Sequence, residues 1–435
     1  MDEEKLQILP PEKRQFPFAP SSLSASLLEK DDFDLDSAVD MSPVCKNAVN
    51  SDMTTTSVLS STDEKEQALC EDALLQQLQS NGFAFIRGTG ISKELCQKAL
   101  HYTKSFLTDA DEDVRRTCLA KDRARRGYSP ICTENFASLI GEHGPNDLVR
   151  KYRIGPTTNP STSISSANDS ATTSTSVPSS LLQPNIWPTA ETWDGTSALS
   201  FQTTLEEYYR EACRAANSVV AAICSAVLRR HPELERSVGV LSSLVAGDGS
   251  SSSASSSSNL ESTSILTLLG YTMGTRHKKK GKKQISPLVA AHTDVGVITM
   301  LLFDGPGCAQ LERNDKEKTD GWTNVSLPFR IPDDPVFVVN IGDCMSELTL
   351  GSLPSTLHRV VADYQHKDPR HCLALFVGLD PQAQLTLPVG CRKDTSGGDN
   401  EAEGDPQVMT YEEWRKNRIA RAQKVLKTKA ALSSG

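Results

Sequence analysis

The chain has 435 residues, 37% of them hydrophobic and 23% charged, which is enough for one large domain or two with part of the chain unstructured. Its net charge of −9 provides no excess of Lys and Arg to face phosphates, which argues against a general nucleic-acid binder. No apolar run reaches the length needed to span a bilayer, and the acidic amino terminus argues against a secretory signal or a mitochondrial presequence.

The N-terminal part is predicted to begin with a disordered tail over residues 1–65, which has Ser-rich and acidic clusters but no sustained hydrophobic period. From residue 66, apolar side chains at helical spacing predict a helix that ends at Asn81-Gly82. A short strand over residues 83–87 and a second helix over about 92–106 are predicted to follow.

Residues 157–183 are nearly all Ser, Thr, Asn and Pro, which predicts a disordered insertion within a domain and not a domain boundary. A long helix is predicted over about 197–230, because its apolar side chains form a broad stripe, and His231-Pro232 ends it. Residues 246–263 form a second, Ser-rich disordered insertion. We therefore interpret 66–245 as a helical N-terminal region.

The C-terminal part changes from helical spacing to short β-prone runs separated by turn residues, which favours a sandwich or barrel over 264–392. A polar insertion over 393–406 and a closing basic helix within 407–435 are predicted to follow. The expected fold class is α+β: a jelly-roll core (double-stranded β-helix, cupin-like) flanked by helices, with disordered insertions. The β-prone runs are 265–273, 288–303, 309–311, 321–325, 336–341, 355–363 and 371–378.

Four residues of this β region predict a metal centre with an anion site beside it. His292 and Asp294 lie two residues apart in a β-prone run, so their side chains share a face, and His358 supplies a third ligand further along. Two His and one carboxylate leave one side of a metal open, as in non-haem Fe(II) oxygenases. Arg370 offers a guanidinium that can grip a carboxylate bidentately.

Each of these residues also has a structural interpretation. His292 alone is more often a hydrogen-bonded barrel histidine, Asp294 alone a turn cap, and Arg370 alone a surface ion pair. The occurrence of all of them in order within one β region favours metal and anion binding.

The same residues resemble the signature of the Fe(II)- and 2-oxoglutarate-dependent dioxygenases of the isopenicillin N synthase-like family, which is His-x-Asp, a distal His and Arg-x-Ser. His292-Thr-Asp294, His358 and Arg370-His-Cys372 are similar to it in order, and Val339-Asn-Ile-Gly-Asp343 is similar to a segment that precedes the distal His. The resemblance covers roughly residues 68–390 with the insertions omitted.

The resemblance implies an oxidoreductase that uses Fe(II), 2-oxoglutarate and O2. Fe(II) would be held by His292, Asp294 and His358, and Arg370 would bind the distal carboxylate of 2-oxoglutarate. The implied reaction hydroxylates, desaturates or closes a ring in a small organic substrate and releases succinate and CO2. No catalytic residue beyond the metal ligands is predicted, and the sequence does not identify the substrate-binding residues.

Two further residues are candidates for co-substrate binding but depart from the family pattern. Cys372 stands where the family has Ser, and a thiol is a weaker hydrogen-bond donor than a hydroxyl. Tyr271 lies in Gly-Tyr-Thr where the family has Tyr-Tyr-Pro, and both core packing and donation to the co-substrate are open for it.

Two alternative functions stay open at this stage. The first is an iron-dependent oxidase of the same family that does not use 2-oxoglutarate. It is considered because Cys372 replaces the Ser of the family pattern. The second is a non-catalytic binding protein on the same barrel, which the intact set of ligands disfavours.

The 11 cysteines form no Cys-x-x-Cys pair, which suits free thiols in a reducing compartment, so a cytoplasmic protein is expected. The basic cluster 276–283 is interpreted as a solvated loop, with a nuclear address as the alternative. We expect a monomer that binds a small-molecule substrate and neither nucleic acid nor membrane.

Overall fold

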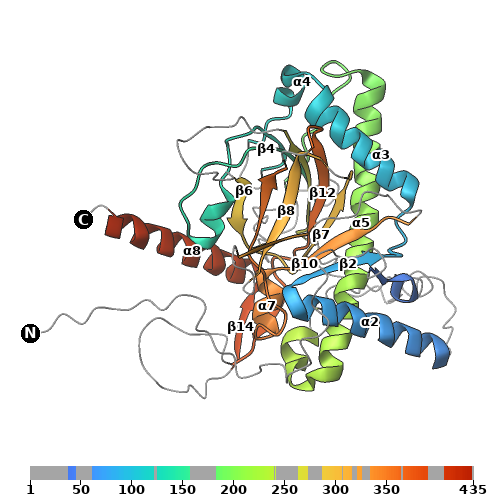
Figure 1. Cartoon of the computed structure of the whole chain (residues 1–435), viewed down its shortest axis with the longest axis vertical. Coiled ribbons are helices and arrows are strands. Elements are labelled where there is room, and N and C mark those ends of the chain that lie inside the picture. The colour runs from blue at the N-terminus through green and yellow to red at the C-terminus, as the bar shows by residue number, and fades with distance from the viewer. Residues whose placement is uncertain are drawn as a thin grey trace, which may run out of the picture.

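The structure is a computed structural model that describes residues 38–45, 61–121, 125–156, 183–239, 241, 263–272, 287–305, 307–315, 321–325, 334–363, 366–389 and 406–433. Within these residues, two sheets pack face to face and helices cover the outer side of the larger one (Figure 1). The predicted α+β class with a two-sheet β core is confirmed.

The larger sheet has eight strands in the order β1-β2-β10-β7-β12-β5-β4-β3. Its neighbours pair antiparallel except for the parallel pair β1–β2. The strands are β1 (Val39–Asp40), β2 (Phe83–Arg87), β3 (Gly127–Ser129), β4 (Val149–Ile154), β5 (Ile265–Tyr271), β7 (Ile298–Phe303), β10 (Phe337–Ile341) and β12 (Arg370–Phe376).

The smaller sheet has the order β6-β11-β8-β9, so β6 is one of its edge strands. A separate ribbon pairs β13 with β14 next to the C-terminal helix. The bounds are β6 (Pro287–His292), β8 (Ala309–Asn314), β9 (Trp322–Asn324), β11 (His358–Ala362), β13 (Gln384–Leu387) and β14 (Gln407–Thr410).

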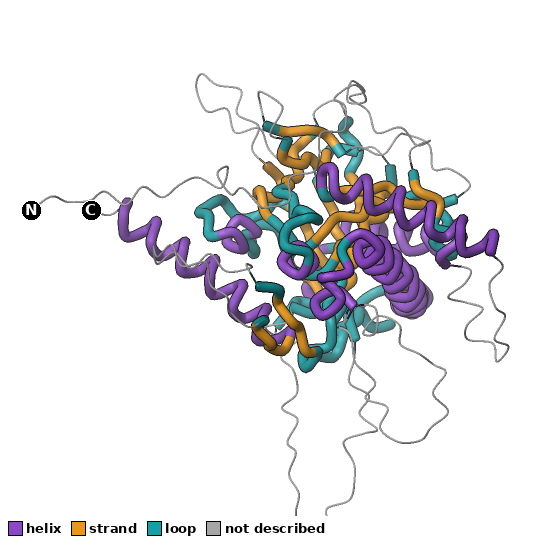
Figure 2. Tube along the Cα trace, turned by 90° about the horizontal axis from the view of Figure 1, so that it is seen from below, coloured by secondary structure: helices purple, strands orange, loops and turns teal. Residues whose placement is uncertain are grey.

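Helices α2, α3 and α5 pack on the outer side of the larger sheet, whereas α8 leaves the body of the protein at the opposite side (Figures 1 and 2). The longer helices are α2 (Ser61–Asn81), α3 (Lys93–Lys104), α5 (Gly195–Arg230) and α8 (Tyr411–Ser433). The shorter helical segments are η4 (Ser105–Asp109), α4 (Glu112–Thr117), η5 (Phe136–Ile140), η7 (Pro232–Leu234), η8 (Glu235–Gly239) and α7 (Asp343–Leu348).

Helix α5 is the central helix of the outer layer. Its N-cap residue Asp194 accepts a hydrogen bond from the Ser197 backbone N–H at 2.9 Å, and Pro232 follows its last turn, as predicted. No apolar run of membrane-spanning length is predicted from the sequence, but among the described helices α5 alone is long and apolar enough to cross a membrane. Of its most apolar window, 61% is buried inside the protein, as in a core helix.

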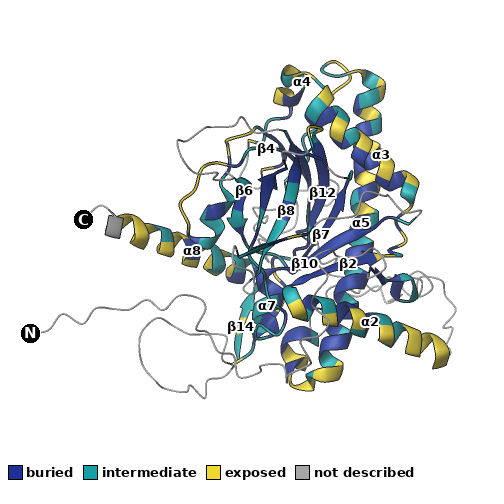
Figure 3. Ribbon diagram, in the orientation of Figure 1, coloured by how far each residue is buried: buried dark blue, intermediate teal, exposed yellow. Residues whose placement is uncertain are grey.

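The fold has two apolar cores, one on each side of the larger sheet. One lies between this sheet and the helices, and the other between the two sheets. Figure 3 shows the strands as largely buried and the outward helix faces as exposed. The core between the sheets is the one that contains the candidate site.

The N-terminal half differs from its prediction in two respects. Residues 38–45 are ordered, because β1 adds to the edge of β2 and Met41 is fully buried, so the predicted tail 1–65 is wrong there and for the start of α2 at Ser61. The region 66–245 also contributes β2, β3 and β4 to the larger sheet. β4 was missed because three of its six residues are Arg or Lys, which does not read as a strand.

The predicted run 288–303 forms two strands in different sheets, with a turn between them that carries Asp294. The rest of the predicted tail and the basic cluster 276–283 lie outside the described residues. So do the predicted insertions 157–183, 246–263 and 393–406, except for the last residue of each.

Candidate metal centre and its pocket

The two histidines of the predicted centre come from adjacent strands. His292 ends β6 and His358 begins β11, and these two residues are direct partners in the antiparallel pairing of the strands. Directly opposed side chains in such a pair lie on the same face. The imidazole centroids are accordingly 4.4 Å apart.

Asp294 completes the group from the turn after β6. Its Oδ1 lies 3.7 Å from His292 Nε2, and its Oδ2 lies 3.9 Å from His358 Nε2. One ligand atom from each residue falls within 4.8 Å of the others, and all three residues are buried. Two imidazole nitrogens and a carboxylate oxygen at this spacing fit one Fe(II) ion with an open side.

The backbone orients both imidazoles in the same way. His292 Nδ1 lies 2.8 Å from the Ala290 carbonyl oxygen, and His358 Nδ1 lies 3.0 Å from that of Thr356. A carbonyl oxygen only accepts, so each Nδ1 carries the proton and donates it. Each Nε2 therefore keeps its lone pair for a metal.

Asp294 is oriented by two neutral side chains. Its Oδ2 accepts hydrogen bonds from Thr299 Oγ1 at 2.6 Å and from Asn340 Nδ2 at 2.8 Å. Oδ1 is left to face His292. Hydrogen bonds of this kind fix the rotamer of a ligating carboxylate, and the sequence alone did not identify Thr299 or Asn340.

The surroundings keep His292 and Asp294 in the protonation states that a metal requires. Burial and the neighbouring His358 lower the pKa of His292 to about 3, so its imidazole is neutral at physiological pH. Burial opposes ionisation of Asp294, but the two imidazoles together with Thr299 and Asn340 hold the pKa of its carboxyl below the usual range. A neutral imidazole and an ionised carboxylate are the forms that bind metal.

The triad lines an apolar pocket between the two sheets. Alternate residues of β12 line it, as the two-residue period of a strand requires. The polar lining consists of the triad with Thr299, Asn340, Arg370, Cys372 and Tyr271. The apolar lining is Phe136, Leu269, Val289, Leu301, Phe303, Leu311, Val360, Ala374 and Phe376.

Arg370 lies in this pocket, on the sheet that faces the two histidines. It is 4% exposed, and its guanidinium carbon lies 4.1 Å from the centroid of the Phe303 ring. One terminal nitrogen donates to the Ala309 carbonyl, whereas Nε is buried with no hydrogen-bond partner among the residues that the structure describes. Burial lowers the pKa of this guanidinium. A buried cation without a carboxylate partner in the described part of the chain fits an anionic ligand.

Tyr271 and Cys372 flank Arg370 on the same face of the larger sheet. Tyr271 is the direct partner of Arg370 in the β5–β12 pairing, and Cys372 is two residues further along β12. Burial raises the pKa of both side chains, so the phenol and the thiol are neutral. Both side chains line the same pocket as Arg370, and their roles stay predictions.

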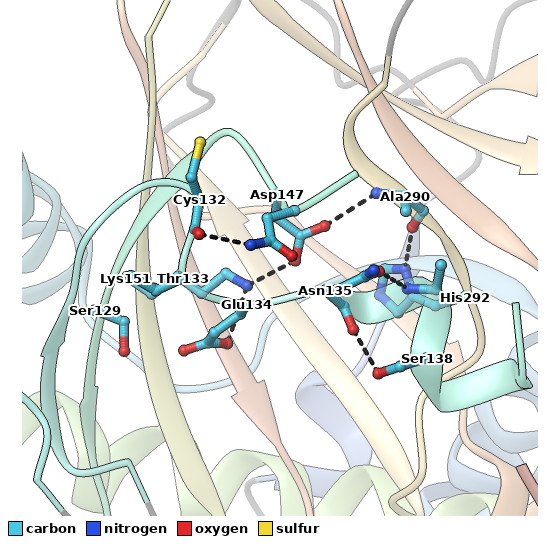
Figure 4. Close-up of polar contacts among 12 residues, drawn as sticks. Ser129, Cys132, Thr133, Glu134, Asn135, Ser138, Asp147, Lys151, Ala290 and His292 are labelled. Atoms are coloured by element: carbon cyan, nitrogen blue, oxygen red, sulfur yellow. Dashed lines mark hydrogen bonds and ion pairs between the residues drawn. The ribbon is translucent and has the colours of Figure 1, made fainter. Parts of the chain in front are cut away.

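A buried group of charged residues supports the edge strand that carries His292 (Figure 4). Asp147 accepts a hydrogen bond from the Ala290 backbone N–H at 3.3 Å, and Lys151 Nζ lies 3.0 Å from Asp147 and 3.1 Å from Glu134. Ala290 is the residue whose carbonyl orients His292. The Asp147 carboxylate thus accepts a backbone hydrogen bond on the edge of β6 that has no neighbouring strand.

The same group of charged residues contacts Phe136, whose ring lines the pocket beside His292. Lys151 Nζ lies 3.7 Å from the centroid of the Phe136 ring, and this ring lies 4.7 Å from the imidazole of His292. Arg153 makes a bidentate pair with Glu134 at 2.7 Å for both bonds. Sequence reasoning missed this cluster, and its only signal was the two-residue period of Val149, Lys151 and Arg153.

Replacing Lys151 with methionine should lower the free energy of unfolding by roughly 3–5 kcal/mol, because Asp147 would be left buried without its cation. Chemical denaturation measures this loss. Lys104→Met is the matched control, since Lys104 pairs with Asp109 at an exposed site and its loss should change stability by less than about 0.5 kcal/mol. Equal effects of the two substitutions would contradict a stabilising role for the buried cluster.

Comparisons with known proteins agree with this geometry. Residues 272–379 match the family model of the 2OG-Fe(II) oxygenase superfamily. Residues 53–190 match the model described as non-haem dioxygenase in morphine synthesis N-terminal. The first of these segments contains the three candidate metal ligands together with Arg370 and Cys372, and Tyr271 directly precedes it.

Among the curated relatives, the 2-oxoglutarate-Fe(II) type oxidoreductase ppzD of Metarhizium rileyi is 26% identical over 323 residues, which are 73% of this chain and 76% of the relative. Clavatol oxidase claD of Penicillium crustosum is 28% identical over 286 residues, or 65% of this chain and 72% of the relative.

Solved structures share the fold. A full-length protein of Neurospora crassa, solved in complex with alpha-KG, has a TM-score of 0.58 and 18% identity, over 89% of this chain and 98% of that one. A 2OG-Fe(II) oxygenase family protein from Caulobacter crescentus has a TM-score of 0.56 and 19% identity, over 84% of this chain and 99% of that one.

Proposed function

The chain belongs to the 2-oxoglutarate- and Fe(II)-dependent oxygenases, and on that basis we propose how its own residues serve this chemistry. It is an oxidoreductase that oxidises a small substrate with Fe(II), 2-oxoglutarate and O2. We propose that His292, Asp294 and His358 hold the iron and that Arg370 binds the distal carboxylate of 2-oxoglutarate.

The observation that carries the proposal is the convergence of three buried side chains whose ligand atoms are already oriented. Both Nε2 atoms and Asp294 Oδ1 face a common point, and hydrogen bonds to the other ring nitrogens and to Oδ2 hold them there. Arg370 faces the same pocket from the opposite sheet. When bound, iron and 2-oxoglutarate activate O2 for oxidation of the substrate, with release of succinate and CO2.

The protein supplies binding, orientation and exclusion of water. Phe, Leu and Val side chains make up most of the apolar wall of the pocket, and a dry wall strengthens the attraction between Arg370 and a carboxylate. The same wall favours a substrate that is apolar where it enters the site. Placement of the substrate decides whether the product is hydroxylated, desaturated or cyclised.

The test is formation of succinate from 2-oxoglutarate by the purified full chain across a panel of small metabolites, with and without added Fe(II). We expect turnover that requires Fe(II) and rises with the correct substrate. Succinate formation that is the same without Fe(II) would contradict the proposal.

The alternatives raised from the sequence are separated by calorimetry with 2-oxoglutarate on the Fe(II)-loaded protein without oxygen. Tight binding excludes an iron oxidase that does not use 2-oxoglutarate. Equimolar uptake of Fe(II) excludes a non-catalytic protein that has lost its metal centre. Failure of both measurements would leave the proposal without support.

Replacing Cys372 with serine should lower the KM for 2-oxoglutarate by roughly fivefold. A hydroxyl is a better donor than a thiol, and one hydrogen bond contributes about 1 kcal/mol. Steady-state kinetics at saturating substrate measures the change. Cys308→Ser is the control, because Cys308 is a buried thiol that bonds to the Tyr271 carbonyl and is absent from the pocket lining. An unchanged or higher KM in Cys372→Ser would contradict a hydrogen bond from residue 372 to the co-substrate.

The cellular setting remains a proposal. The ten cysteines within the described ranges are all free thiols, which supports a reducing, cytoplasmic compartment. A monomer that acts without nucleic acid or membrane is proposed on the sequence composition alone.

A further inference from the structure

Arg418, on the inward face of the C-terminal helix α8, contacts three separate segments around the candidate metal centre. Its Nε donates to Asp343 Oδ2 at 2.8 Å, and a terminal nitrogen lies 2.7 Å from the same oxygen. That terminal nitrogen, Nη2, also donates to Thr293 Oγ1 at 3.2 Å. The other terminal nitrogen, Nη1, donates to the Leu139 carbonyl at 2.9 Å. The side chain is only 14% exposed.

Two of these contacts lead to the metal ligands. Thr293 is the residue between His292 and Asp294, and its hydroxyl also donates to Asp343 Oδ2 at 3.2 Å. The Asp343 backbone N–H donates to the Asp294 carbonyl at 2.7 Å. Asp343 therefore binds the ligand turn at the Asp294 backbone, and both Asp343 and Arg418 bind it at the side chain of its central residue, Thr293.

The third contact leads to the pocket wall. Leu139 belongs to η5, and Phe136 of the same segment packs against the imidazole of His292 at 4.7 Å between ring centroids. By bonding the Leu139 carbonyl, Arg418 holds η5 against the ligand turn. A planar guanidinium suits this role, because its five N–H groups point in fixed directions toward several acceptors.

We infer that Arg418 is a positioning residue that holds the His292–Asp294 turn in its metal-binding geometry. The inference rests on the proposed iron site and adds α8 to it. The turn needs such support because it lies between β6 and β7, which belong to different sheets, so strand pairing does not fix it. Outer contacts that orient ligands change metal affinity by about 10- to 100-fold.

Helix α8 has an anchor that does not depend on Arg418. Trp414 is 1% exposed, stacks on Tyr411, and donates from Nε1 to Glu347 at 2.7 Å. These contacts should keep α8 docked when residue 418 is changed. Substitution at 418 can therefore be examined in a folded full-length protein.

The experiment measures Fe(II) affinity by anaerobic titration and coordination by the visible spectrum of the Co(II)-loaded protein. Arg418→Gln should weaken Fe(II) binding by about 10- to 100-fold and alter the Co(II) spectrum. Arg418→Lys should recover part of the loss, because lysine keeps the charge but cannot reach all three segments. Arg421→Gln is the matched control, since Arg421 lies one turn along α8 and pairs with Glu347 at 2.6 Å, away from the ligand turn, and it should bind Fe(II) within about twofold of wild type.

If Arg418→Gln does not fold, a second variant, Thr293→Val, tests the positioning role of Arg418. Thr293→Val removes only the hydroxyl that joins the turn to Arg418 and Asp343, and leaves the bonds from Arg418 to Leu139 and Asp343 in place. It should weaken Fe(II) binding several-fold. Wild-type affinity in a folded Arg418→Gln, or in Thr293→Val when the first variant is unfolded, would overturn the inference. A wild-type protein that binds neither Fe(II) nor Co(II) would overturn the proposed function as well, so the two failures are distinguishable.

Discussion

Asp294→Ala should reduce Fe(II) affinity by more than about 100-fold, beyond the range seen for residues that only orient ligands, and should abolish 2-oxoglutarate turnover. Asp294 supplies the only carboxylate of the triad, so its loss leaves two neutral imidazoles to hold a dication. It also leaves Thr299 and Asn340 without the oxygen to which they donate. Anaerobic Fe(II) titration measures the first effect and succinate formation the second.

The control for this substitution is Asp109→Ala. Asp109 is an exposed carboxylate that pairs with Lys104 outside the pocket lining, so Fe(II) binding and turnover should match wild type. A melting temperature for both variants separates loss of metal from loss of fold. If Asp294→Ala were folded and still bound Fe(II) with wild-type affinity, the assignment of the triad would be wrong.

Arg370→Ala should raise the KM for 2-oxoglutarate by at least about 30-fold, since truncating one member of a buried charge pair costs roughly 2–5 kcal/mol. The guanidinium is buried and makes no ion pair with a carboxylate of the described residues, so the distal carboxylate of a bound co-substrate would pair with it directly. Loss of the arginine leaves that distal carboxylate unpaired in an apolar pocket. Steady-state kinetics with varied 2-oxoglutarate measures the effect.

The ligand offers a complementary test of the same contact. A 2-oxo acid without a distal carboxylate, such as 2-oxovalerate, should be a poor co-substrate for wild type and about equally poor for Arg370→Ala. Arg359→Ala is the matched control, because Arg359 pairs with Glu312 on the other sheet, outside the pocket lining, and its loss should leave KM unchanged. Preference for 2-oxoglutarate over 2-oxovalerate that survived in Arg370→Ala would contradict the assignment of the distal carboxylate.

The sequence identified the residues that converge but not all of the reasons why they do. His292 and Asp294 are only two positions apart along the chain, so they stay close although Asp294 lies in the turn after β6. The third ligand depends on the pairing of β6 with β11, in which His358 lies opposite His292, and register of this kind is not readable from either strand. Family resemblance supplied that step.

The supporting residues could not be predicted because their contacts are long-range and join unlike segments. Arg418 reaches Thr293 across 125 positions of the chain, and Asp147 reaches Ala290 across 143. β4 was missed because two of its three charged residues, Lys151 and Arg153, are buried against Glu134 and Asp147. The assumption that charged residues are exposed fails wherever both members of an ion pair are buried.

The ligands of the proposed iron and the arginine that would hold the far end of 2-oxoglutarate stand on opposite walls of the β core. The histidines belong to the four-stranded sheet and Arg370 to the eight-stranded one. The spacing between the two sheets therefore limits the length of the 2-oxo acid that can reach from the iron to Arg370. We expect a homologue longer by one methylene, 2-oxoadipate, to be rejected, because accepting it would require two packed walls to move apart.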